Sequence, residues 1–134
     1  MHQRLPLLSA GILGATGVAC GALGAHALNS HLVALGTRGV WETAVNFQMY
    51  HALALLGMAG WMRPIPTGQA AKRATRAVRS WVAGTILFSG FLYVLALGGP
   101  NWVGAITPVG GLLLILGWCY AALAAVAPRS EYDI

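Results

Sequence analysis

Residues 80–128 read SWVAGTILFSGFLYVLALGGPNWVGAITPVGGLLLILGWCYAALAAVAP, with no Asp, Glu, Lys or Arg in 49 positions. A membrane-spanning helix needs about 20 mostly apolar residues. This stretch is therefore too long for one span and long enough for two, at about 80–97 and 106–126. Glycines, a proline and an asparagine at positions 98–101 predict the turn between them. The second span begins either at the capping pair Thr107-Pro108 or earlier, at Asn101, with a kink at the proline.

Two further stretches without these four residue types hold one predicted span each. Residues 5–37 supply 33 such positions and residues 43–62 supply 20, which predicts spans of about 5–28 and 40–62. The expected fold class is therefore all-α, an integral membrane four-helix bundle formed by one transmembrane domain, residues 1–134.

The composition agrees with this prediction. Hydrophobic residues make up 57% of the chain, and charged residues make up 8%, against about 25% in soluble domains. These values exclude an ordinary soluble enzyme, a disordered chain and a nucleic-acid-binding domain. The net charge of +5 therefore does not indicate a nucleic-acid partner.

The basic residues predict the orientation of the spans. Lys and Arg accumulate in short cytoplasmic loops of membrane proteins. Five of the eight basic residues lie in the loop 63–79, so we expect this loop and both termini to be cytoplasmic. Four of the five recur at helical spacing and predict a helical lead-in to the third span. These four residues are Lys72, Arg73, Arg76 and Arg79. They either only determine the orientation of the spans or also recognise anionic lipid headgroups.

Small residues follow two sides of the first predicted span. Spacings of three and four place one set on a single helical stripe, and small residues let helix backbones approach closely in lipid. The opposite side carries Ala15, Ala19 and Ala22. We therefore expect this helix to be central, with neighbours on both sides. The stripe predicted to pack consists of Gly14, Gly17, Gly21 and Gly24.

The second predicted span is unusually polar, and ionisable residues inside membranes are by default functional candidates. At 100° per residue, Glu42 and Asn46 share one face, whereas Gln48 and His51 share another. We expect the second pair to form hydrogen bonds to another span, with Ser89, Thr85 or Tyr93 as the partner of His51. The candidate ligand or interhelical polar site consists of His26, Glu42, Asn46, Gln48 and His51.

The outer rim of the predicted membrane domain offers two pairings for Glu42. The carboxylate either pairs with Arg38, four residues earlier on the same helix, or contacts His26 on the first span. Four of the five tryptophans fall at predicted span ends, where the interfacial aromatic belt lies, and Trp118 alone lies inside a span.

The sequence contains no catalytic motif, and it predicts no catalytic residue. The spacing between His26 and His31 matches no strong metal template, and phosphate-binding and nucleophile-elbow signatures are absent. No cofactor is predicted. A metal ion or a quinone remains possible at the polar residues, and the metal ligands are unknown.

Several segments together resemble the YgdD-like family, the domain of unknown function 423. They are Gly24-Ala25-His26-Ala27-Leu28, Trp41-Glu42-Thr43-Ala44, Gln48-Met49-Tyr50-His51-Ala52-Leu53, Phe88-Ser89-Gly90 and Gly104-Ala105-Ile106-Thr107-Pro108. The resemblance implies a small four-helix protein of the bacterial inner membrane, and it assigns no catalytic residue.

Three functions follow as hypotheses. The first is a non-enzymatic oligomer or an accessory subunit of a larger membrane complex, with membrane lipid around it. The second is a protein that binds a quinone, a lipid or a metal ion through polar residues in the outer half of the bilayer. The third is a small oligomeric channel or transporter.

Overall fold

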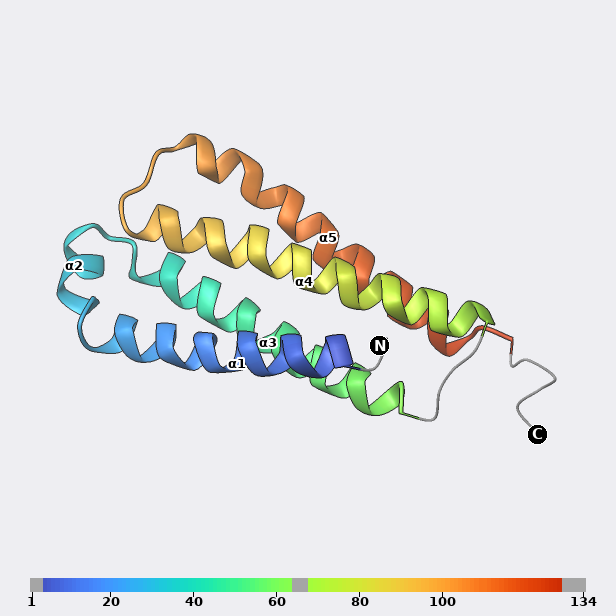
Figure 1. Ribbon diagram of the computed structural model, residues 1–134. Coiled ribbons are helices and arrows are strands. Elements are labelled where there is room, and N and C mark those ends of the chain that lie inside the picture. The colour runs from blue at the N-terminus through green and yellow to red at the C-terminus, as the bar shows by residue number, and fades with distance from the viewer. Residues whose placement is uncertain (1–3, 64–67, 129–134) are drawn as a thin grey trace.

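The computed structural model describes residues 4–63 and 68–128, and these residues form helices without any strand (Figure 1). Four helices are long, and α2 is a single short segment. They are α1 (Arg4–Ala25), α2 (Asn29–Ala34), α3 (Arg38–Trp61), α4 (Gly68–Ala96) and α5 (Trp102–Ala125). The all-α prediction is confirmed for the part of the chain that is described.

Three of these helices are long and apolar enough to cross a membrane, namely α1, α4 and α5. Helix α3 has 24 residues, which gives enough length, but it does not reach the same hydropathy. The reason is its polar residues, which are concentrated toward its start; they are Arg38, Glu42, Asn46, Gln48 and His51.

Two helices begin earlier than the apolar spans themselves. Helix α4 begins at Gly68, which confirms the predicted helical lead-in: the basic segment and the third predicted span form one continuous helix of 29 residues. Helix α5 begins at Trp102 and contains Pro108 in its interior, which is the second of the two alternatives from the sequence. Proline has no N–H for the helix ladder, and one turn of α5 therefore lacks a backbone bond. The hydroxyl of Thr107 donates to the carbonyl of Val103 at 3.2 Å.

The long helices pack in the order of the chain, as two antiparallel hairpins. Figure 1 shows α1 beside α3 and α4 beside α5, with α3 packed against α4 between the hairpins. The prediction that the first helix is central is wrong, because α1 lies at one edge and its main partner is α3. Ala15, Ala19 and Ala22 on its other side are exposed.

The hairpin of α4 and α5 is held by glycines at its closest approach. A Cβ atom on Gly110 would lie 2.5 Å from the backbone nitrogen of Phe88, and one on Gly84 would lie 2.7 Å from a methyl carbon of Leu114. A Cβ on Gly117 would overlap the ring of Trp81. Each contact needs a residue without a side chain, because helices in lipid associate largely through close packing.

The predicted glycine stripe of α1 makes unequal contacts with α3. A Cβ on Gly17 would lie 2.6 Å from the sulfur of Met49, and one on Gly24 would overlap the indole of Trp41. A Cβ on Gly21 would be in ordinary contact with Val45 at 3.5 Å, whereas one on Gly14 would meet nothing within 4 Å. Close packing against α3 is therefore concentrated at two of the four predicted positions.

The end of the molecule that carries α2 is fastened to the turn between α4 and α5. The hydroxyl of Thr37 donates to the carbonyl of Ala96 at 2.6 Å. Gly98 ends α4 with φ of +89°, a left-handed conformation that glycine adopts without a steric penalty. A small core of Leu32, Trp41 and Ala96 lies beneath this fastening.

Candidate functional site

The side chain of Gln48 joins three helices in the middle of the molecule. Its Nε2 donates to the carbonyl of Leu13 at 2.9 Å and to the hydroxyl of Thr16 at 2.8 Å, both on α1. Its Oε1 accepts a hydrogen bond from the Tyr93 hydroxyl of α4 at 2.8 Å. The residue is only 5% exposed. A buried amide is costly unless its donors and acceptor are paired, and here all are used. The expected bond from Gln48 to another span is confirmed.

His51 connects α3 to α5. Its Nδ1 lies 2.8 Å from the carbonyl of Phe47, and its Nε2 lies 3.2 Å from Nε1 of Trp118. Because an indole nitrogen can only donate, Nε2 of His51 must accept and Nδ1 must carry the proton. The geometry therefore selects one neutral tautomer.

The predicted partners of His51 are wrong. Tyr93 donates to Gln48 instead, and the buried hydroxyls of Thr85 and Ser89 have no hydrogen-bond partner among the residues that the structure describes. The indole of Trp118 reaches His51 from α5 instead. The sequence signal for this contact is the position of Trp118, the one tryptophan away from a predicted span end.

Aromatic rings surround the imidazole. The rings of Trp81 and Trp118 lie 4.8 Å apart in an edge-to-face arrangement, and each lies within 6.5 Å of the His51 ring. Trp81 is only 2% exposed, so the interpretation that it belongs to an interfacial belt is wrong. It packs inside because α4 begins twelve residues before the predicted span and Gly117 leaves room for its ring.

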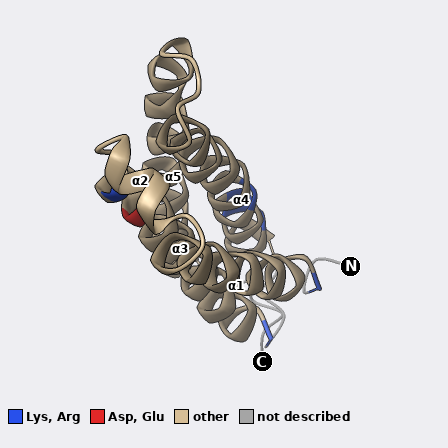
Figure 2. Cartoon of the chain, turned by 90° about the vertical axis from the view of Figure 1, so that its left-hand side faces the viewer, with Lys and Arg blue, Asp and Glu red and all other residues tan. Residues whose placement is uncertain are grey.

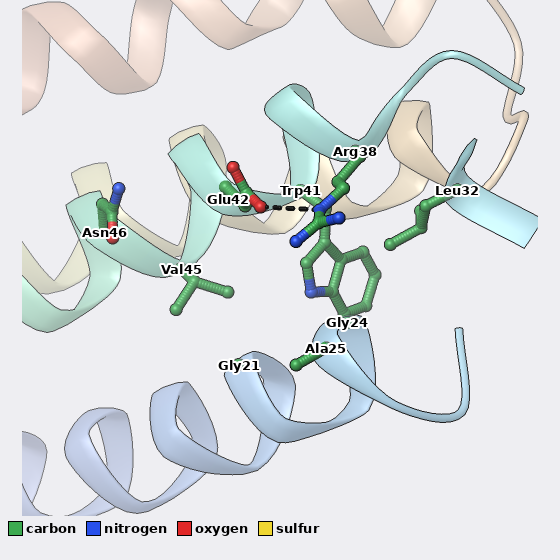
Figure 3. A pocket seen from close by; sticks show the side chains of 9 residues that line it. All are labelled: Gly21, Gly24, Ala25, Leu32, Arg38, Trp41, Glu42, Val45 and Asn46. Atoms are coloured by element: carbon green, nitrogen blue, oxygen red, sulfur yellow. Dashed lines mark hydrogen bonds and ion pairs between the residues drawn. The ribbon is translucent and has the colours of Figure 1, made fainter. Parts of the chain in front are cut away.

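Glu42 and Asn46 lie away from this interior network, at a pocket of about 210 Å³ between α1, α2 and α3 (Figure 3). Nε of Arg38 donates to Oε1 of Glu42 at 2.9 Å, which confirms the predicted pair on one helix. We call the pocket between α1, α2 and α3 the Arg38 pocket. It is lined by Gly21, Gly24, Ala25, Leu32, Arg38, Trp41, Glu42, Val45 and Asn46.

The remaining candidate, His26, lies just beyond the end of α1 and is exposed. Its expected contact with Glu42 is replaced by the ion pair of that carboxylate with Arg38. Within residues 4–63 and 68–128, no group of three His, Cys, Asp or Glu side chains could hold a metal ion. The five candidates thus separate into an interior pair, a pocket pair and an isolated histidine.

Four basic residues near the start of α4 form what we call the basic stripe: Lys72, Arg73, Arg76 and Arg79. Two of them contact α5. Nη1 of Arg73 donates to the carbonyl of Leu123 at 2.8 Å, where a cation is favourable because the C-terminal end of a helix carries partial negative charge. The guanidinium of Arg76 lies 5.8 Å from the centre of the Tyr120 ring. Lys72 and Arg79 are exposed and are the members of the stripe that are free of these contacts with α5.

Comparison with known proteins finds a family model and several relatives. Residues 20–111 match the model described as protein of unknown function (DUF423). A UPF0382 membrane protein of Staphylococcus haemolyticus is 43% identical, over 75% of this chain and 78% of its own. A UPF0382 membrane protein of Haemophilus influenzae is 35% identical, over 84% and 86%. The UPF0382 inner membrane protein YgdD of Escherichia coli is 34% identical, over 94% and 92%. No solved structure gives a significant match.

Proposed function

The chain belongs to the DUF423 family of proteins of unknown function, and on that basis we propose that it is a multi-pass inner-membrane protein that acts without catalysis. Its role is to assemble in the bilayer, as an oligomer or as an accessory subunit of a membrane complex. The inner-membrane location follows the name of the relative YgdD and the three apolar helices.

In the proposed topology all four long helices cross the membrane and both chain ends are cytoplasmic. The charges support this orientation. Arg4 at the start of α1 and the basic stripe near the start of α4 belong to one end of the molecule, whereas Arg38 begins α3 at the other. In Figure 2, acidic positions are red and basic positions are blue. One acidic and one basic position lie together beside α2, and further basic positions lie on α4 and near the two chain ends.

The engagement of the polar side chains supports a role without catalysis. Gln48 uses its whole amide in bonds to α1 and α4, and His51 uses both ring nitrogens. A general base needs a free nitrogen or oxygen within reach of its substrate. These two residues instead fix the positions of α1, α4 and α5 around α3.

The observation that carries the assembly role is the outer side of α1. Gly11, Ala15, Ala19 and Ala22 are exposed there, while the opposite side of the helix packs on α3. A lipid-facing helix gains nothing from small residues, whereas a helix–helix contact in lipid is favoured by them. A shallow groove of about 540 Å³ runs along the first half of this side, between Arg4 and Ala15.

The test is the oligomeric state of the protein in liposomes, measured by single-molecule photobleaching over a range of protein-to-lipid ratios. Ala15→Leu is expected to lower the oligomeric fraction, because it fills the exposed side of α1. Ala122→Leu is the matched control, since this alanine is exposed on α5. A wild-type protein that is monomeric at every ratio, and that forms no crosslinks in native membranes, would contradict the proposal.

A further inference from the structure

The Arg38 pocket holds opposite charges that the assembly role does not use. Arg38 and Glu42 form an ion pair at its mouth, with side chains 54% and 58% exposed. A half-exposed pair of this kind contributes little to stability. Stabilising the fold is therefore not a sufficient reason for an Arg38–Glu42 pair beside a pocket between three helices, and we ask what the pocket could bind.

The cationic side of the pocket suits an anion such as a phosphate. Only Nε of Arg38 is used by Glu42, which leaves the two terminal nitrogens as a planar fork of the kind that binds phosphate. Arg38 is also the first residue of α3, where the helix dipole disfavours a cation. The hydroxyl of Thr37 forms no capping bond with this helix, and it donates to the carbonyl of Ala96. An anion at this point would compensate both the guanidinium and the helix end.

The anionic side of the pocket suits an ammonium group with N–H donors. Oε1 of Glu42 accepts from Arg38, and the second carboxylate oxygen is available beside it. The amide of Asn46 follows one turn later on the same face of α3 and also lines the pocket. Figure 3 shows Glu42 and Asn46 side by side along α3, with the Arg38 guanidinium next to the carboxylate.

The other walls of the pocket are apolar, and the residues that α1 contributes are small. Gly21, Gly24 and Ala25 of α1 face α3 across the pocket, and Leu32 and Val45 complete its sides. A Cβ on Gly21 would make only ordinary contact with Val45, so the pocket stays open on the α1 side. Elsewhere on α1, the helix that forms one wall of the pocket, large apolar side chains are exposed, among them Leu23 at 47%. The pocket thus opens beside a surface that suits lipid acyl chains.

We infer that the Arg38 pocket binds the headgroup of an ethanolamine phospholipid, with the phosphate on Arg38 and the ammonium on Glu42 and Asn46. The pair of opposite charges matches the pair in the headgroup, and the exposed apolar side chains of α1 accommodate the attached chains. A lipid reaches this pocket from within the bilayer, whereas the apolar walls offer a soluble zwitterion few partners. The inference does not depend on oligomer formation.

The test uses the full-length protein in nanodiscs made of equal parts phosphatidylethanolamine, phosphatidylglycerol and phosphatidylcholine, with retained lipids counted by native mass spectrometry. Phosphatidylglycerol lacks the ammonium, and the methylated ammonium of phosphatidylcholine has no N–H. We expect about tenfold preferential retention of phosphatidylethanolamine, the effect of one charge-assisted hydrogen bond. Glu42→Gln should abolish this preference, and Arg38→Gln should lower retention of both phosphatidylethanolamine and phosphatidylglycerol.

Two further variants separate pocket occupancy from charge and folding. Ala25→Leu fills the pocket with the charges intact and should reduce phosphatidylethanolamine retention, whereas Ala122→Leu on α5 should not. Arg79→Gln removes an exposed charge elsewhere and should leave the preference for phosphatidylethanolamine over phosphatidylcholine unchanged, and helix content by circular dichroism checks the fold of each variant. Equal retention of the three lipids by the wild type overturns the inference. Tighter binding of soluble phosphoethanolamine than of phosphatidylethanolamine would also overturn it, because the acyl chains would then contribute nothing.

Discussion

At the scale of single residues, the structure explains why the polar half of α3 is stable in an apolar protein. Gln48 contacts α1 and α4, and one turn later His51 contacts α5. The two residues share a face of α3, as their spacing predicts, but neighbouring helices divide that face between them. Buried polar groups in membranes are tolerated when other helices supply their partners.

Replacing Gln48 with Leu tests this account. The change removes three hydrogen bonds to other helices, and bonds of this kind in membranes average about 0.6 kcal/mol each. It also leaves the hydroxyl of Tyr93 without its acceptor. We expect the free energy of unfolding in mixed micelles to fall by about 2 kcal/mol.

Asn46→Leu is the matched control for this change, because Asn46 lies on the same helix and is exposed. It should alter the free energy of unfolding by no more than about 0.5 kcal/mol. Equal losses for the two variants would show that the three hydrogen bonds of Gln48 contribute no more to stability than the exposed amide of Asn46 does.

At the scale of helices, glycine positions determine how closely the hairpins pack. The α4–α5 hairpin depends on Gly84, Gly110 and Gly117, each of which lies against a side chain or backbone of the facing helix. Arg73 adds a bond from α4 to the last turn of α5. Arg73 therefore forms a contact between two helices of the protein. The sequence predicted instead that it lies at the membrane surface, together with the other basic residues of this segment.

Adjacent glycines on α5 give a sharp test of this packing. A Cβ on Gly110 would lie 2.5 Å from the backbone of Phe88, whereas one on Gly111 would lie 3.7 Å from the ring of the same residue. Gly110→Ala should therefore lower the free energy of unfolding by about 1–3 kcal/mol through overpacking. Thermal and denaturant unfolding in detergent would measure the loss.

Gly111→Ala serves as the control, because its added methyl group makes an ordinary van der Waals contact. It should be neutral or slightly stabilising, since alanine favours a helix more than glycine does. If both variants lost the same stability, the α4–α5 contact would not be as close as the structure has it.

Much of the helix pattern could be predicted from the sequence, because charge-free stretches mark apolar helices directly. Basic residues at helical spacing also predicted the helical lead-in to the third span, and α4 begins at Gly68. The start of α5 was less predictable, because Pro108 can either follow a helix cap or lie inside a helix. The partner of His51 could not be predicted, because the contact with Trp118 depends on how two hairpins cross. The position of α1 at the edge could not be predicted either. Small residues follow both sides of this helix in the sequence, but only one side packs against α3.

At the scale of the whole molecule, the number of membrane crossings depends on α3. Its 24 residues extend for about 36 Å at 1.5 Å per residue, which exceeds the hydrocarbon thickness of about 30 Å. Its hydropathy falls short of that of the other long helices, but Gln48 and His51 in its middle are bonded to α1, α4 and α5, and Arg38 and Glu42 near its start pair with each other. We therefore expect α3 to cross the membrane despite its composition.

Single cysteines on either side of α3 decide this point. In a background with Cys20→Ala and Cys119→Ser, we place one cysteine at the exposed Ser30 of α2 and another at the exposed Gln69 of α4. Spheroplasts are then treated with a membrane-impermeant maleimide. If α3 crosses the membrane, Ser30→Cys is labelled in intact spheroplasts and Gln69→Cys only after lysis. Labelling of both positions before lysis would mean that α3 stays on the outer side, and labelling of Gln69→Cys alone would reverse the proposed orientation.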